Sequence, residues 1–208
     1  MRSLGIVFIA FAPIASAQPP NMQAISQALG VPCDYCHAPE NALKREIAGA
    51  MIAMTRDINM RIHEATAIEA TAVTCVTCHR GVAIPRPLGD ILTQTMKDKG
   101  VTAAIDQYRD LRGKFYGRQA YDFGEDTLIT LGRQFAQSRP SDSIALLQLN
   151  LEFYPRSAST YAEIAFAYTR KLDDASAIAN LEKALEIEPN NGIIRGQLEQ
   201  LKSYHRAR

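Results

Sequence analysis

The sequence has 208 residues, of which 47% are hydrophobic and 22% are charged, so it is typical of a chain that folds around a core. Its 23 basic and 22 acidic side chains leave a formal charge of +1, and no basic stripe is present of the kind that nucleic-acid-binding proteins carry. With no tryptophan, eight tyrosines and seven phenylalanines, the chain has little from which to build a base-stacking platform or a carbohydrate cleft.

The first 17 residues predict an export signal. Arg2 precedes an apolar run over residues 4–14, and the small residues 15–17 follow in the pattern that a signal peptidase cuts. This run is far shorter than the roughly 20 apolar residues that span a bilayer. No cysteine stands near the cut to carry a lipid. We therefore expect cleavage after Ala17 and a periplasmic or otherwise exported protein without a lipid anchor.

The four cysteines fall into two pentapeptides. These are Cys33-Asp34-Tyr35-Cys36-His37 and Cys75-Val76-Thr77-Cys78-His79. In this attachment pattern of c-type haem, the two thiols add to the vinyl groups of the macrocycle and the adjacent imidazole binds the iron. The pattern predicts two covalently attached haem c groups, with His37 and His79 as the proximal iron ligands.

Two other interpretations of the cysteines remain open. Four cysteines in an exported protein commonly form two disulfides. Paired C-x-x-C units also hold zinc, although ribbon-type zinc sites separate the pairs by about 15–20 residues. Here the much longer segment 37–74 lies between the pairs, and zinc would leave the two adjacent histidines unexplained.

The second axial ligands are sought on two predicted helices. The first spans residues 22–29, with Asn21 as its N-cap and Gly30 as its stop, and begins with Met22. The second spans about residues 41–64 and carries one apolar stripe, made of Ile47, Met51, Met54, Ile58 and Ile62. Methionines in such stripes more often pack than ligate. His63 is a third candidate, and His205 is expected at the surface.

Three stretches of the chain carry a family resemblance. They are Met22 with residues 29–37, then Met51-Ile52-Ala53-Met54-Thr55-Arg56-Asp57-Ile58-Asn59, then residues 73–81. Together they resemble the cytochrome subunit of photosynthetic reaction centres, in which a helix bearing the distal methionine precedes each attachment motif. The resemblance implies that Met22 and Met51 are the distal iron ligands and that Met54 is a packing neighbour. That family carries four haems and this chain has one pair of motifs, so His63 stays unassigned, and a reaction centre is one candidate partner among other redox proteins.

The sequence of the C-terminal half predicts helices. It contains no motif that is typical of a catalytic or cofactor site. After the proline-rich connector at residues 84–89, two helices are expected, with Asp90 and Thr102 as N-caps and Gly100 between them. From about Phe123 the chain repeats. Leu147 and Leu181 are 34 positions apart, as are Pro155 and Pro189, while Phe135 and Tyr168 are 33 apart.

This period predicts tetratricopeptide-like repeats at about residues 124–157 (degenerate) and 158–191 (clear), followed by a capping helix within residues 192–208. The clear copy has small and aromatic residues at the expected positions: Tyr161, Ile164, Ala165, Tyr168, Ala177, Leu181, Ala184 and Pro189. Such repeats commonly bind a partner protein or mediate assembly.

Taken together, these features predict an all-α protein with a dihaem cytochrome c domain at residues 18–89 and a helical repeat domain at residues 90–208. The expected function is electron transfer between redox proteins, with no enzymatic reaction and no nucleic acid. Two alternatives remain. One is a dihaem peroxidase-like enzyme with one open iron, and the other is a binding scaffold that the haems merely stabilise.

Overall fold

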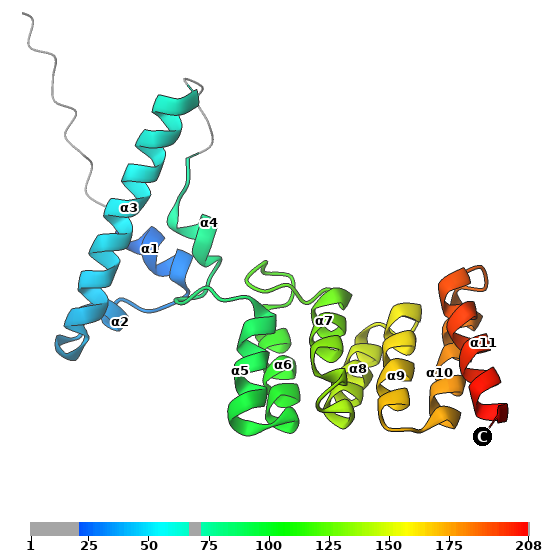
Figure 1. Cartoon of the computed structure of the whole chain (residues 1–208). Coiled ribbons are helices and arrows are strands. Elements are labelled where there is room, and N and C mark those ends of the chain that lie inside the picture. The colour runs from blue at the N-terminus through cyan, green and yellow to red at the C-terminus, as the bar shows by residue number, and fades with distance from the viewer. Residues whose placement is uncertain (1–20, 67–71, 208) are drawn as a thin grey trace, which may run out of the picture. The chain divides into compact units, whose positions relative to one another are not determined.

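The computed structural model describes residues 21–66 and 72–207, and in these ranges the chain is helical with no strand (Figure 1). The predicted all-α fold class is confirmed. The predicted export signal lies outside the described residues. None of the described helices combines the length and the apolar character needed to cross a bilayer.

The chain divides into two compact units, of which one ends at Cys78 and the other begins at His79. The division falls inside the second attachment motif, earlier than the domain boundary expected near residue 89. That boundary stays a prediction.

The N-terminal unit begins with α1 (Met22–Leu29), which is capped as predicted. The Asn21 side chain accepts hydrogen bonds from the backbone N–H groups of Gln23 and Ala24, both at 3.1 Å. Gly30 ends the helix with a left-handed φ of 65°, a conformation that favours glycine. A short α2 (Asp34–His37) and a 3-10 turn (Pro39–Asn41) follow, leading into α3 (Ala42–Thr66). The sequence placed this long helix correctly to within about two residues at each end.

The apolar stripe of α3 is covered only in part: Ile47, Met51 and Met54 are exposed, while Ile58 and Ile62 are half-buried. None of its side chains is buried, and Leu43 and Ile47 are 68% and 53% exposed. Among the residues described in this unit, Ala28 alone is buried. Contiguous exposed apolar surface marks a site that another body covers. The unit thus has almost no core made from its own side chains.

The C-terminal unit is a stack of paired helices (Figure 1). The pairs are α5 (Leu88–Lys99) with α6 (Val101–Phe115), α7 (Glu125–Ala136) with α8 (Pro140–Phe153), and α9 (Ala158–Arg170) with α10 (Asp174–Ile187). α5 packs against α7, α7 against α9, and α6 against α8, while α11 (Gly192–Ala207) closes the stack on α10. The two predicted repeats are therefore preceded by a third helix pair.

Of the eight positions predicted for the clear repeat, five lie in the core, Tyr161 and Tyr168 are half-buried, and Pro189 is exposed. Ile164, Ala165, Ala177, Leu181 and Ala184 are all buried. In the preceding pair Gly132 is equally close-packed, because a Cβ atom added there would lie 2.6 Å from Leu147 Cγ. Small residues stand where the helices approach most closely, as the sequence pattern predicted.

Two predicted N-caps are wrong. α5 already begins at Leu88, directly after Pro87, so Asp90 lies in its first turn instead of capping it. α6 begins at Val101, so Thr102 lies inside the helix. The reason is that Pro87 occupies the N-cap position of α5, and Gly100, with a φ of 88°, occupies that of α6, so each helix has begun before Asp90 or Thr102 is reached. The predicted break at Gly100 is confirmed.

Candidate functional site

Each attachment motif folds into a single helical turn. In the first, the His37 N–H donates to the Cys33 carbonyl at 3.0 Å, which closes the turn of α2. The second forms α4 (Cys75–His79), begun by a hydrogen bond from Thr74 N–H to Thr77 Oγ1 at 3.0 Å. Residues at positions i, i+3 and i+4 of a helix share one face. In both motifs the two thiols and the imidazole therefore project toward the same side.

The cysteines form neither a disulfide nor a zinc cluster. All four thiols are free, with those of Cys33 and Cys78 exposed. Within residues 21–66 and 72–207, no three Cys, His, Asp or Glu side chains converge as a tetrahedral zinc site requires. Two separate sets of two thiols and a histidine match the donor set that c-type haem requires.

The imidazole of His79 is buried and oriented by its own chain. Its Nδ1 lies 3.1 Å from the carbonyl oxygen of Val82. A carbonyl only accepts, so Nδ1 carries the proton and the lone pair is left on Nε2. A tight turn places this carbonyl, since Arg80 and Gly81 have φ angles of 49° and 90° and Val82 N–H donates to the His79 carbonyl at 2.9 Å. Such a hydrogen bond fixes the tautomer and the ring orientation of a metal-ligating histidine.

His37 is held less firmly. Its side chain is exposed, and its ring forms no comparable hydrogen bond with any residue that the structure describes. Its motif is supported by Asn41, whose Nδ2 donates to the Asp34 carbonyl at 3.2 Å, and by Lys44 Nζ, which lies 4.1 Å from the Tyr35 ring centroid. The two motifs thus offer the same donors with different degrees of preorganisation.

A cavity of about 620 Å³ in the N-terminal unit adjoins the second motif. Its walls come from α1, from α3 and from the chain entering α4, and its lining residues are Asn21, Ala24, Ile25, Gln27, Ala28, Ile52, Thr55, Arg56, Val73, Thr74, Cys75 and Val76. Its volume is within the range of cofactor sites in proteins. Its described lining includes Cys75, residues that are mostly apolar, and a single charged residue, Arg56. This chemistry fits a haem, which presents an apolar macrocycle and anionic propionates.

Neither methionine predicted as a distal ligand lines this cavity. Met22 is the first residue of α1 and is 49% exposed. Met51 is 38% exposed and stands beside Ile52 and one turn before Thr55, both of which do line the cavity. Their ligation stays a prediction, as do the haem contacts of the four cysteines and two histidines. His63 is exposed near the end of α3, and the His205 side chain lies outside the described part of the chain.

Sequence reasoning assigned no role to Val82, whose carbonyl orients His79, or to Arg56. A signal for the first existed in Arg80-Gly81, since a glycine directly after the motif permits the tight reversal. The signal for Arg56 was its place in a helix that precedes an attachment motif.

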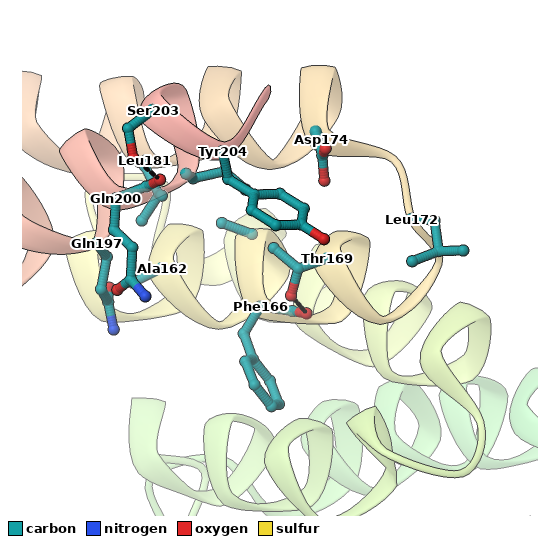
Figure 2. A pocket seen from close by; sticks show the side chains of 12 residues that line it. Ala162, Phe166, Thr169, Leu172, Asp174, Leu181, Gln197, Gln200, Ser203 and Tyr204 are labelled. Atoms are coloured by element: carbon teal, nitrogen blue, oxygen red, sulfur yellow. Dashed lines mark hydrogen bonds between the residues drawn. The ribbon is translucent and has the colours of Figure 1, made fainter. Parts of the chain in front are cut away.

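The C-terminal unit has a second cavity, of about 720 Å³, between α9, α10 and α11 (Figure 2). It is mostly apolar and includes Phe166 from α9, which is 42% exposed, and Tyr204 from α11. An exposed apolar groove of this kind is typical of a protein-binding surface.

Comparison with known proteins extends the sequence resemblance. Residues 22–115 match the family model described as Photosynthetic reaction centre cytochrome C subunit. Over 60 residues the chain is 35% identical to the Photosynthetic reaction center cytochrome c subunit of Rubrivivax gelatinosus, which covers 27% of this chain and 16% of that protein. The family match spans both motifs, α1 and α3, and ends with α6. This part of the chain is thus similar to a family of c-type cytochromes, and the similarity supports a role in electron transfer.

Proposed function

We propose that this protein is an exported dihaem c-type cytochrome that passes single electrons between redox proteins. The observation that carries the proposal is the pair of C-x-x-C-H motifs, each folded into one helical turn, whose four cysteines lie in a unit that buries almost none of its own described side chains. Two haems would supply the missing apolar bulk and cover the exposed part of the stripe on α3. The similarity of residues 22–115 to a cytochrome c family supports the same conclusion.

In this proposal Cys33 and Cys36 hold one haem and Cys75 and Cys78 hold the other. The haem supplies one-electron chemistry at its iron, and the chain holds the iron rigidly and shields it from water. His79 is prepared for its role as an Nε2 ligand by the Val82 carbonyl. Arg56, which lines the adjoining cavity, would offset the negative charge of a propionate if the haem occupied that cavity.

Electron transfer is favoured over peroxidase-like chemistry by the surroundings of the cavity. A general acid–base reaction needs a titratable pair near the reacting atoms. Among the residues that the structure describes, the lining of this cavity includes Arg56 and no carboxylate or histidine. A methionine as the sixth ligand would close each iron to substrates and raise its reduction potential relative to a second histidine.

The C-terminal unit is proposed to dock or assemble the cytochrome with a protein partner. The α7–α8 and α9–α10 pairs follow the 33- to 34-residue period of tetratricopeptide repeats, and the groove exposes Phe166 and Tyr204. Repeat stacks of this type use such surfaces to bind proteins.

The test is an optical spectrum of the oxidised and reduced full chain, produced with a c-type maturation system, for wild type, Met22→Ala and Met51→Ala. Wild type is expected to show two low-spin haems with the charge-transfer band of methionine–iron(III) ligation, and each variant is expected to lose about half of that band. Met54→Ala and Met60→Ala are the matched controls on α3 and are expected to keep it. A wild-type protein with one high-spin haem that readily binds cyanide or peroxide would instead support the enzyme.

A further inference from the structure

The side chain of Asn59 on α3 is hydrogen-bonded to both backbone groups of one residue just ahead of the second motif. Asn59 Nδ2 donates to the Val73 carbonyl at 2.8 Å, and Val73 N–H donates to Asn59 Oδ1, also at 2.8 Å. The amide thus pairs with Val73 as a neighbouring peptide group would in a sheet. Both groups are part-buried, which favours the bond because water competes less there.

This amide pair stands at the edge of the cavity described above. Asn59 follows Thr55 by one helical turn, and Thr55 and Arg56 line the cavity from α3. Val73, Thr74 and Cys75, in the segment that leads into α4, line the cavity opposite α3. The two hydrogen bonds between Asn59 and Val73 therefore fix the spacing between α3 and the segment that carries the attachment cysteines.

The hydrogen bonding continues from Val73 into the motif. Thr74 N–H donates to Thr77 Oγ1 at 3.0 Å, and Thr77 N–H donates to the Thr74 carbonyl at 3.1 Å, which starts α4. An unbroken series of hydrogen bonds thus leads from Asn59 to the turn that presents Cys75 and Cys78. Among the described residues, the first motif has no counterpart of this pair of hydrogen bonds. Asn41 donates only one hydrogen bond there, to the Asp34 carbonyl at 3.2 Å.

We infer that Asn59 is a positioning residue, which fixes the second attachment motif against α3 and thereby holds the distal ligand of the second haem on its iron. This inference rests on the proposed function. Cys75 and Cys78, predicted to hold the second haem, lie on α4, and the predicted distal ligand, Met51, lies on α3, so that haem needs a constant spacing between the attachment cysteines and α3. Asn59 supplies the donor and the acceptor that maintain it.

Displacement of the distal ligand by imidazole tests this role. The ferric dihaem protein is mixed with imidazole and the haem absorbance is followed by stopped flow, which reports how often each distal bond opens. The two kinetic phases are assigned with a Cys33→Ala/Cys36→Ala variant that retains only the second haem. Asn59→Asp keeps the acceptor and removes the donor. It is expected to accelerate the second-haem phase roughly three- to tenfold, the effect of losing one hydrogen bond, and to leave the first phase unchanged.

Asn180→Asp, the same chemical change on α10, is the matched control and is expected to leave both phases unchanged. Asn59→Gln keeps both hydrogen-bonding groups and is expected to stay closer to wild type. If Asn59→Asp yields no dihaem protein, Asn59→Ser takes its place with the same expected acceleration. An unchanged second phase, or an equal acceleration of both phases, would overturn the positioning role. A wild-type protein without covalent haem would overturn the proposed function as well, so the two failures are distinguishable.

Discussion

The two histidines of the attachment motifs show how neighbouring residues prepare the same side chain differently. His79 is buried and bonded through Nδ1 to the Val82 carbonyl, whereas His37 is exposed. The motif spacing predicts both histidines as ligands but contains no information on their surroundings. The surroundings of His79 depend on a turn at Arg80 and Gly81, whose φ angles the motif does not specify.

The turn at Gly81 yields the first prediction. Gly81→Ala is expected to lower the free energy of unfolding by about 1–2 kcal/mol, because its φ of 90° disfavours any residue with a Cβ. No atom lies within 4 Å of the added Cβ, so the cost comes from the backbone alone. Denaturant unfolding of the full-chain holoprotein measures it. Gly81→Asn is expected to cost less, since asparagine tolerates the left-handed region, and an alanine variant as stable as wild type would contradict the argument.

At the scale of elements, the sequence predicts helices more reliably than their caps. α1 and α3 follow from a cap, a glycine stop and a 3.6-residue apolar period, and both lie within two residues of expectation. Asp90 and Thr102 suit an N-cap chemically, yet the helices begin earlier. Pro87 and Gly100 already occupy the N-cap positions of α5 and α6, and the propensity of one residue does not report that a neighbour begins the helix.

Helix packing in the repeat unit gives the second prediction. Gly132→Ala is expected to destabilise the protein by about 1–3 kcal/mol, because its Cβ would overlap Leu147 where α7 meets α8. Gly113→Ala on α6 is the matched control, with no atom within 4 Å of its Cβ. It is expected to be neutral or to stabilise by up to about 1 kcal/mol. Thermal or denaturant unfolding distinguishes the two, and equal effects would argue against close packing at Gly132.

At the scale of the whole molecule, the two units differ in how much apolar core their own side chains form. The C-terminal unit has a continuous apolar core in its α5–α8 half, including Leu92, Met96, Tyr108, Leu128 and Leu146. In the N-terminal unit only Ala28 is buried among the described residues. The sequence predicts an apolar stripe on α3, and a stripe of this kind usually packs against a core. In the structure Ile47, Met51 and Met54 of this stripe are exposed and Ile58 and Ile62 are half-buried, so the described side chains cover the stripe only in part.

This difference predicts that the N-terminal unit depends on its haems. A variant with all four cysteines changed to alanine is expected to lose protection from hydrogen exchange in α1 and α3, because helices without tertiary packing are marginal in water. α5 to α11 are expected to stay protected in the same sample. Peptide-resolved exchange measures both regions, with the wild-type holoprotein as the reference. Equal protection of α3 with and without haem would show that the unit has a core of its own.

The extent of the helical stack was harder to predict than its repeats. The 34-residue period identifies α7 to α10, but the α5–α6 pair shares no repeat signature and still packs on them. The family match ends with α6, so this pair belongs to the cytochrome-like part of the sequence while it extends the stack. Sequence periodicity detects similar repeats, whereas stacking requires only a complementary apolar face.

The central claim is that both motifs carry covalent haem, and mass spectrometry tests it most directly. The full chain is produced with a c-type maturation system, its intact mass is measured under denaturing conditions, and its peptides are sequenced. We expect the mass of two haems, one on the peptide with Cys33 and Cys36 and the other on the peptide with Cys75 and Cys78. A mature chain without haem, or with zinc bound through the four thiols, would contradict the account.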